Sequence, residues 1–357
     1  MHNVRRVRQS PAAIQANKER ERSKIVDYLA LTNDVISRKN NKDWSRDAFD
    51  ATQKLLEKNP EFYTIWNYRR NIMLNGIFPD STSEQLNNIL ASELMLTTTA
   101  LKDHPKVYWL WNHRHWCLQN IPDGPIVKRN QLAVVDKMLN ADPRNFMAWN
   151  YRRYVLASMP IQRPETAELA YTTRKISSSF SNFSAWHQRS KIYTSLWRSG
   201  QLDPVKSRDE ELELIHNAIY TDPDDQSAWI YHRWLMGSGT ANSSARFNAD
   251  NLAQPIGENE KQLLREIMVI EELLDEQPDS KWCMDSLVYY NRLLLQKHRP
   301  HSTELRGKCL VLLQQLEDID PPRRYRYWET GIQPKRFEGS SLMRSPNVYE
   351  HLLICLL

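Results

Sequence analysis

Two basic residues occupy equivalent places in neighbouring segments of this sequence, and together they could bind an anion. Lys106 and Arg144 each directly follow a proline at the predicted start of a helix. The corresponding residues elsewhere are acidic: Glu61, Asp224 and Asp279. The positive end of a helix dipole favours acidic side chains, so two cations there are unfavourable unless an anion binds between them. The pattern predicts an anion site at Lys106 and Arg144, with two solvated side chains as the alternative.

The histidines and cysteines show no metal-binding pattern. His113 and His115 are two residues apart and would point to different sides of a helix, and no Cys, Asp or Glu lies at zinc spacing from them. The four cysteines are far apart and form no C-x-x-C pair, which indicates core thiols: Cys117, Cys283, Cys309 and Cys355. Neither G-x-G-x-x-G nor H-E-x-x-H is present. The sequence therefore predicts no metal site and no complete active site in this chain.

Tryptophan supplies the strongest pattern in the chain. Six of the 12 tryptophans recur at intervals of 37 to 53 residues: Trp66, Trp111, Trp149, Trp186, Trp229 and Trp282. Four of these six have a proline six residues earlier, preceded by a polar residue, which is typical of the boundary between two helices. Repeats of this length are typical of stacked helix pairs. We therefore predict an all-α superhelix, a right-handed solenoid of about seven helical hairpins.

The repeats also define the domain organisation. The predicted hairpins cover residues 44–58/61–75, 83–103/106–120, 125–140/144–158, 165–179/182–198, 207–220/224–236, 259–276/279–297 and 302–318/322–328. We assign residues 25–330 to one helical-repeat domain with a loop insertion at 237–259, which is rich in Gly, Ser, Ala and Asn. Residues 1–24 are predicted to be a mobile basic arm, and residues 331–357 a C-terminal tail.

The charge of the chain is concentrated in that arm. Residues 1–24 hold seven Lys or Arg against two Glu, and the rest of the chain holds 41 basic and 41 acidic residues. A nucleic-acid-binding protein usually carries its basic excess on the folded body, so we expect no nucleic-acid partner. No apolar run approaches the roughly 20 residues of a membrane span, which predicts a cytosolic or nuclear protein that is not an integral membrane protein. His2 could reach a metal in a partner, although a disordered tail is the alternative.

A Trp-x-x-Arg signature follows five of the tryptophans. The sequence reads W-N-Y-R-R, W-N-H-R-H-W, W-N-Y-R-R, W-H-Q-R and W-I-Y-H-R-W, and the arginines are Arg69, Arg114, Arg152, Arg189 and Arg233. A Trp and an Arg three or four residues later share one helix face. We interpret most of these pairs as core tryptophans whose arginines bond to neighbouring helices. The same residues could instead line a large interface with a partner protein.

With five signatures in register, residues 40 to 330 resemble the protein prenyltransferase α subunits. Within that family, the segments 143–154, 180–190 and 221–235 are similar to the α subunit of Rab geranylgeranyltransferase, the type II enzyme. They are less similar to the α subunit shared by farnesyltransferase and geranylgeranyltransferase type I, which stays as an alternative. The resemblance is to the short form, without immunoglobulin-like or leucine-rich-repeat domains.

The resemblance implies a crescent of hairpins that wraps a β subunit in an obligate heterodimer. The β subunit is expected to hold the catalytic zinc and most of the lipid pocket. The implied reaction is the transfer of geranylgeranyl from geranylgeranyl diphosphate to cysteines near the C-terminus of Rab GTPases, presented by a Rab escort protein. The implied location is the cytoplasm, and the chain is expected to be active only with its β subunit.

The resemblance also gives a role to the predicted anion site. Lys106 and Tyr108 match a P-K-x-Y motif of the family, whose lysine faces the diphosphate, and Asn145 and Phe146 match a pair that lines the same region. Lys106 is the implied catalytic residue, which would stabilise the negative charge that grows on the leaving diphosphate. Arg144 would bind the same group.

Two other classes of protein share parts of this pattern. A tetratricopeptide-like scaffold without catalytic function would form a similar solenoid, but it has no reason to repeat Trp-x-x-Arg or to reverse the charge at two adjacent helix starts. A helical-repeat protein of RNA processing would need a basic body, and this body is neutral.

Overall fold

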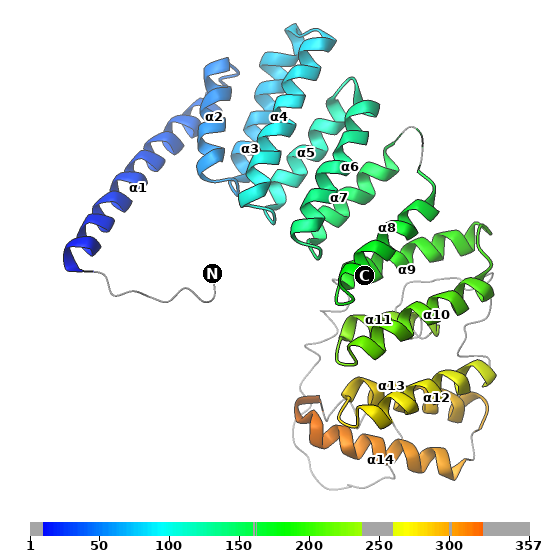
Figure 1. Cartoon of the computed structure of the whole chain (residues 1–357). Helices are drawn as coiled ribbons and strands as arrows, with labels where there is room; N and C mark the ends of the chain where they lie inside the picture. The colour runs from blue at the N-terminus through cyan, green and yellow to red at the C-terminus, as the bar shows by residue number, and fades with distance from the viewer. Residues whose placement is uncertain (1–9, 160, 162, 238–259, 300–301, 324–357) are drawn as a thin grey trace, which may run out of the picture. The chain divides into compact units, whose positions relative to one another are not determined.

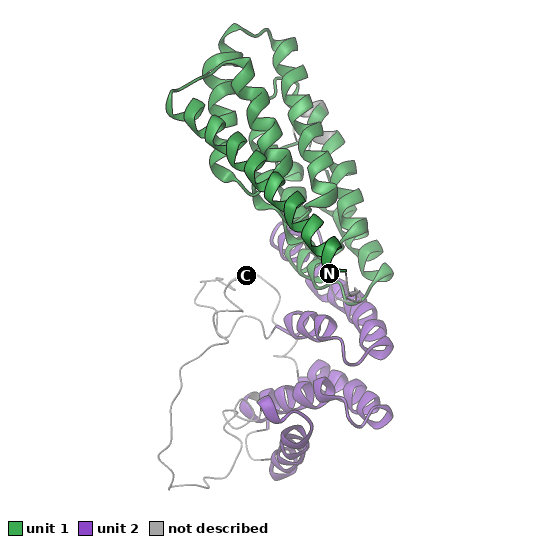
Figure 2. Ribbon diagram, turned by 90° about the vertical axis from the view of Figure 1, so that its left-hand side faces the viewer, with its two compact units in different colours: residues 1–192 green, residues 193–357 purple. Residues whose placement is uncertain are grey.

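The computed structural model describes residues 10–159, 161, 163–237, 260–299 and 302–323, and all regular secondary structure in these ranges is helical. The chain forms two compact units, residues 1–192 and residues 193–357 (Figure 2). Within each unit, helices that are consecutive along the chain pair as hairpins (Figure 1). The predicted all-α hairpin fold is confirmed, and the handedness of the superhelix stays a prediction.

Unit 1 begins with the long helix α1 (Pro11–Asn40), which packs against α2. Hairpin 1 is α2 (Arg46–Lys58) and α3 (Tyr63–Ile72), hairpin 2 is α4 (Ser83–Asp103) and α5 (Tyr108–Asn120), hairpin 3 is α6 (Gly124–Ala141) and α7 (Phe146–Ala157), and hairpin 4 is α8 (Glu165–Ser178) and α9 (Phe183–Arg198). A π-helical turn at Met73–Ile77 and a 3₁₀ turn at Phe78–Asp80 follow α3. The last turns of α9 belong to unit 2.

Unit 2 continues the same pattern. Hairpin 5 is α10 (Pro204–Thr221) and α11 (Gln226–Leu235), and hairpin 6 is α12 (Glu260–Glu276) and α13 (Lys281–Lys297). The helix α14 (Thr303–Ile319) packs on α13 and ends in a 3₁₀ turn at Pro321–Arg323. Most of the loop insertion expected at 237–259 and the tail expected at 331–357 lie outside the described residues, as does most of the predicted helix 322–328.

The helix α1 crosses the boundary that we predicted between a basic arm and the folded domain. It begins at Pro11, where the side chain of Ser10 accepts a hydrogen bond from the backbone N–H of Ala13. Its later turns are held to hairpin 1, because Val35 is buried and Tyr28 accepts a hydrogen bond from Asn59. The segment has little apolar periodicity, so its helicity was not evident from the sequence. Residues 1–9, which include His2, lie outside the described residues.

The constant spacing between the repeat prolines and tryptophans has a hydrogen-bonding cause. In five hairpins the indole N–H of the repeat Trp donates to the carbonyl oxygen six residues earlier, at N···O distances of 2.7–3.0 Å: Trp66 to Pro60, Trp111 to Pro105, Trp149 to Pro143, Trp186 to Phe180 and Trp229 to Pro223. A buried indole N–H needs such an acceptor. The prolines therefore lie in the interhelical turns, and most of the second helices begin two residues later than we predicted.

Two other expectations can be compared with the structure. Cys117, Cys283 and Cys309 are free, buried thiols, as predicted for core residues. Of the helices in the described ranges, none combines the length and the apolar composition that crossing a membrane requires.

Candidate functional site

The residue three places after each of the first five repeat tryptophans occupies one structural position, which we call the signature position. It is held by Arg69, Arg114, Arg152, Arg189 and His232. All five residues are buried, and so are the five tryptophans, of which none is more than 5% exposed. The interpretation of these residues as core is confirmed. The chain's own hairpins cover these side chains, and a partner interface along the repeats stays a prediction.

Each buried arginine bonds back to the first helix of its own hairpin. The Nη1 atom of Arg69 donates to the carbonyl of Phe49 at 2.7 Å and to the hydroxyl of Thr52 at 2.8 Å, both on α2. Arg114 and Arg189 make the same type of contact with carbonyl and threonine groups of α4 and α8. These contacts close each hairpin on itself and satisfy most of the buried guanidinium N–H groups, although Nε of Arg114 has no hydrogen-bond partner among the described residues.

Three of these arginines, Arg69, Arg114 and Arg152, also bond forward to the next hairpin, and we call these contacts inter-hairpin links. Arg69 donates two hydrogen bonds to Glu93 of α4, at 2.8 and 2.7 Å. Arg152 donates two to Glu168 of α8, at 2.9 and 2.7 Å, while Arg114 donates to Gln131 of α6. Burial alone would raise the pKa of Glu93, but hydrogen bonds from Arg69 and His113 outweigh it and lower this pKa to about 2. The ionised carboxylate therefore holds two hairpins together.

The fifth repeat differs from our assignment. We placed the signature arginine at Arg233, but the structure puts His232 at the signature position and fully buries it. Arg233 is one residue further along α11, bonds to Asp285 at 2.9 Å and keeps a side chain that is 24% exposed. The sequence contains W-I-Y-H-R, so counting three residues from Trp229 instead of accepting three or four would have identified His232.

The turns that precede α5 and α7 carry the predicted anion-binding residues. Lys106 and Arg144 lie in these turns, one residue before the N-caps Val107 and Asn145, and not within the helices as we predicted. Both residues are exposed. The Nζ atom of Lys106 lies 3.1 Å from a carboxylate oxygen of Asp142, and the Lys106 side chain is 69% exposed. An ion pair with this much exposure contributes only about 0–1 kcal/mol, so Lys106 can exchange this partner for another anion.

Asn145 brings the two turns together. Its side-chain oxygen accepts hydrogen bonds from the backbone N–H groups of Met147 and Ala148, which caps α7. Its side-chain NH₂ donates to the carbonyl of Pro105 in the other turn, at 3.0 Å. Asn145 is 2% exposed, so it acts as a buried tie between neighbouring turns and its side chain is not free to contact a substrate. The sequence predicted that Asn145 belongs to this region but not this bridging role.

Exposed aromatic side chains mark the first residue of three consecutive second helices. Tyr63 of α3, Tyr108 of α5 and Phe146 of α7 are 53%, 50% and 65% exposed. The Tyr63 and Tyr108 rings both lie near Trp109, at centroid distances of 5.1 and 5.2 Å. Large aromatic groups that stay exposed next to cationic turns are typical of a surface that binds a partner or an amphipathic ligand. The structure therefore groups Lys106, Arg144, Tyr108 and Phe146 along one row of turns in unit 1.

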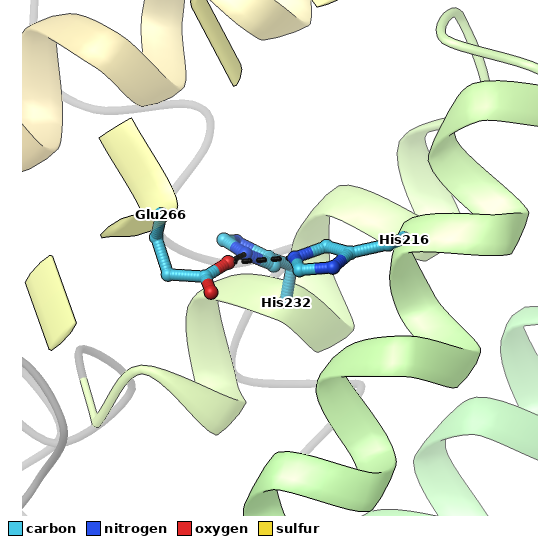
Figure 3. Close-up of side chains that lie close together, drawn as sticks. All are labelled: His216, His232 and Glu266. Carbon is cyan, nitrogen blue, oxygen red and sulfur yellow. Dashed lines mark hydrogen bonds and ion pairs between the residues drawn. The ribbon is translucent and has the colours of Figure 1, made fainter. Parts of the chain in front are cut away.

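A cluster in unit 2 was missed by our sequence analysis. His216, His232 and Glu266 come from α10, α11 and α12, and their side chains converge (Figure 3). The His216 and His232 Nε2 atoms lie 2.8 and 3.0 Å from the same oxygen of Glu266. The three residues are too far apart in sequence to form a local motif, because they meet only when two hairpins pack. By contrast, His113 bonds to Glu93 and packs on Trp66, as expected for a satisfied core histidine.

Comparisons with known proteins agree with this architecture. The family model of the protein prenyltransferase alpha subunit repeat matches residues 45–76, 90–121, 129–159, 166–196 and 208–238. The geranylgeranyl transferase type-2 subunit alpha of Schizosaccharomyces pombe is 38% identical, over 92% of this chain and 96% of its own length. The Saccharomyces cerevisiae protein of the same name is 35% identical, over 92% and 98%. The Bos taurus protein of that name is 34% identical, and its match covers 69% of this chain and 43% of its own length.

The chain therefore belongs to the protein prenyltransferase α-subunit family. A solved structure, described as Candida albicans protein geranylgeranyltransferase-I complexed with GGPP, aligns over 86% of this chain and 91% of that chain with a TM-score of 0.63. At 19% sequence identity this likeness shows the fold alone. The relatives that match over nearly their whole length define the function class more closely, which is that of a type-2 geranylgeranyl transferase α subunit.

Proposed function

We propose that this chain pairs with a prenyltransferase β subunit and that the heterodimer transfers geranylgeranyl from geranylgeranyl diphosphate to C-terminal cysteines of Rab GTPases. The type-2 relatives support this choice over farnesyltransferase and geranylgeranyltransferase type I. We further propose that a Rab escort protein presents the substrate. A cytoplasmic location is part of the same proposal, and the three buried free thiols are consistent with a reducing compartment.

The observation that supports this function most directly is the row of exposed turns in unit 1. Lys106 and Arg144 present two cations on neighbouring turns, which Asn145 ties together. The helix α5 starts at Tyr108 without a side-chain cap, so the backbone N–H groups of its first turn can add to the attraction for an anion. Exposed Tyr108 and Phe146 lie beside these cations and offer an apolar surface to the isoprenoid or to the β subunit.

In the reaction, the allylic C–O bond breaks, the diphosphate leaves with the bonding electrons, and a cysteine sulfur forms the new bond to carbon. Zinc held by the β subunit would lower the pKa of the substrate cysteine, so that its thiol proton would go to solvent and its thiolate would be the nucleophile. The part of this chain proposed to take part in chemistry is Lys106, whose Nζ would move from Asp142 to the diphosphate. A cation stabilises the leaving group most when its negative charge is largest, so this contact strengthens in the transition state.

Replacing Lys106 by alanine in the assembled heterodimer tests this role. We expect Lys106→Ala to slow single-turnover transfer by roughly 10- to 1000-fold, with a much smaller change in affinity for geranylgeranyl diphosphate. Arg144→Ala should act in the same direction more weakly. Lys102→Ala is a matched control, because Lys102 is an exposed lysine in the last turn of α4. A wild-type single-turnover rate for Lys106→Ala would remove Lys106 from the mechanism.

The assay also separates this function from a scaffold without catalysis. The chain is expected to be inactive alone and active with a β subunit. Transfer is expected to be faster from geranylgeranyl diphosphate than from farnesyl diphosphate, and to need a Rab substrate with its escort protein. Full activity without a β subunit, or no activity with one, would contradict the proposal.

A further inference from the structure

The cluster of His216, His232 and Glu266 has the geometry of a small metal site. Both histidines direct their Nε2 atoms at a single carboxylate oxygen, at 2.8 and 3.0 Å, and the three ligand atoms lie within 4.8 Å of one another (Figure 3). Glu266 and His232 are buried, while the His216 side chain is 20% exposed. Three donor atoms therefore surround one point that is closed on the protein side and open toward solvent at His216.

The charge of this link differs from that of the links in unit 1. Glu93 and Glu168 are each paired with a buried guanidinium, from Arg69 and Arg152. At the same position Glu266 meets His232, which carries no permanent charge. Hydrogen bonds from His216 and His232 outweigh the effect of burial and lower the pKa of Glu266 to about 2, so the carboxylate is ionised. In the fifth hairpin the signature position thus lacks the permanent cation that neutralises Glu93 and Glu168.

His216 also occupies a place that is defined by the repeat. It lies 16 residues before the signature residue, as Thr98, Asp136 and Thr173 do in three earlier hairpins. In those hairpins this residue bonds to the guanidinium of the signature arginine. In the fifth hairpin the guanidinium is absent, and two imidazoles surround the carboxylate instead. In the link between hairpins 5 and 6, two imidazole nitrogens therefore face the carboxylate where a guanidinium faces Glu93 and Glu168.

The donor set selects a class of metal. Two imidazole nitrogens and one carboxylate oxygen are typical zinc ligands, at metal–ligand distances of about 2.0–2.2 Å in roughly tetrahedral sites. Ligand atoms bound to one ion at these distances lie slightly further apart than 2.8 and 3.0 Å, so small side-chain movements suffice. The His232 Nδ1 atom lies 2.7 Å from the buried hydroxyl of Tyr290. In a metal-bound state this hydroxyl can accept a hydrogen bond from Nδ1–H, which leaves Nε2 free to bind the metal.

We propose that His216, His232 and Glu266 bind one divalent ion of the zinc class, with the fourth coordination position open beside His216. The ion would neutralise the buried carboxylate and join hairpin 5 to hairpin 6, as the arginines join the hairpins of unit 1. This site belongs to the α chain and is separate from the zinc expected in the β subunit. It does not depend on the role assigned to Lys106.

The zinc content of the heterodimer tests the proposal. Wild-type and variant complexes are dialysed against micromolar zinc and then against metal-free buffer, and zinc is measured by elemental analysis. We expect His216→Asn to contain one zinc ion fewer per heterodimer than the wild type, because zinc in the β subunit contributes equally to both. His104→Asn is the control, since His104 is an exposed histidine at the end of α4, and it should match the wild type.

A second, milder variant tests the proposal even if the ligand variants do not fold. Tyr290→Phe keeps the aromatic ring and all three ligands, and the loss of this outer contact should weaken zinc affinity roughly 10- to 100-fold. The affinity is measured by competition with a zinc-binding dye. Zinc bound by the His216→Asn heterodimer is subtracted as the background. If His216→Asn does not fold, Glu266→Gln provides the background. Equal zinc content in the wild type, His216→Asn and Glu266→Gln would overturn the proposal and leave a purely hydrogen-bonded link. An equal loss of zinc in His104→Asn would also overturn it, because it would indicate surface binding.

Discussion

The link between hairpins 1 and 2 and the link between hairpins 5 and 6 occupy the same place in the repeat but differ in chemistry. In the first link, Arg69 gives Glu93 two hydrogen bonds and a permanent positive charge. In the second, His232 gives Glu266 one hydrogen bond, and His216 gives another. Burial lowers the pKa of His232 more than its bond to Glu266 raises it, so His232 is neutral at pH 7.

The fold requires a buried hydrogen-bond acceptor in each link but not one particular donor. A buried acceptor on the first helix of the next hairpin is present in both cases, because the donors on the preceding hairpin would otherwise lose their hydrogen bonds. The donor can change between guanidinium and imidazole when a neighbouring side chain supplies the missing bond. The carboxylate of the first link is therefore paired with a permanent charge, although His113 also bonds to it and has a pKa lowered by burial. The carboxylate of the second link is bonded to two imidazoles, whose charge depends on protons or on a metal ion.

The largest effect is expected from removing the arginine of the first link. Arg69→Met leaves an ionised Glu93 buried without its guanidinium, which should lower the free energy of unfolding by about 3–5 kcal/mol. The shift is measured by urea denaturation of the heterodimer. Arg46→Met is the control, because Arg46 is an exposed partner of Asp50 and its loss should change the free energy by at most about 1 kcal/mol. Equal shifts for the two variants would refute the importance of the buried link.

A smaller effect is expected from removing the histidine of the second link. His232→Leu keeps a side chain of similar size but loses the hydrogen bonds to Glu266 and Tyr290. Because the lost donor is neutral, the free energy of unfolding should fall by about 1–3 kcal/mol in the presence of EDTA. A loss as large as that of Arg69→Met would show that His232 is charged in the folded chain, contrary to the comparison.

The dependence of stability on pH, compared between His232→Leu and the wild type, should reveal the contribution of His232. His232 has a folded-state pKa below its ordinary value of 6.5, so in acid the unfolded chain takes up this proton more readily than the folded chain does. The stability that neutral His232 contributes to the folded chain is present above pH 6.5 and is lost as the pH falls below 6.5 toward the folded-state pKa. In EDTA, the free energy of unfolding should fall less steeply with decreasing pH below 6.5 for His232→Leu than for the wild type. The two slopes should differ by at most about 1.4 kcal/mol per pH unit.

A second acid transition applies to both links. The pKa values of Glu93 and Glu266 are lowered from 4.5 to about 2, so the stability from their ionised forms is lost as the pH falls from 4.5 toward 2. Arg69→Met should still lose stability as the pH falls below 6.5, since this variant leaves His232 in place. Denaturant titrations at several pH values measure both effects, and identical pH profiles for His232→Leu and the wild type would contradict the assignment.

The smallest effect on stability is expected at the exposed turns. Lys106→Ala removes only the ion pair with Asp142, so the free energy of unfolding should change by at most about 1 kcal/mol. Urea denaturation of the same preparation that is used for the rate measurement checks this value. A large loss of stability would place Lys106 with the buried links instead of with the exposed functional surface, and a slower transfer rate could then reflect misfolding.

Much of the fold could be predicted from the sequence because each repeat is marked by residues at short, regular spacings. The recurrence of Trp and Pro predicted the hairpins, and the Trp indole to carbonyl hydrogen bond explains why their spacing of six residues is constant. The predicted helix starts were early, because proline takes the turn position before the helix and not its first turn. The basic composition of residues 1–24 hid the start of α1, whose helicity comes from a capped N-terminus and from packing of its later turns.

The site was predicted less completely for a related reason. Lys106, Tyr108 and Phe146 follow from the family motif and Arg144 from the charge reversal, and the structure shows all four exposed in two turns and at the helix starts that follow them. The ion pair of Lys106 with Asp142 and the bond from Asn145 to Pro105 join residues more than 30 positions apart, so no local pattern contains them. The same is true of the signature residues, whose acceptors on the next hairpin are not marked in the sequence.

The sequence by itself determined the period, the helical class and the family, because these depend on residue types at short and regular spacings. Only the tertiary structure decided which side chains meet. His232 and not Arg233 is buried at the signature position, because the rotation of α11 against α10 and α12 selects the third residue after Trp229. His216, His232 and Glu266 converge because three helices pack, and packing brings together residues that are 16 and 34 positions apart.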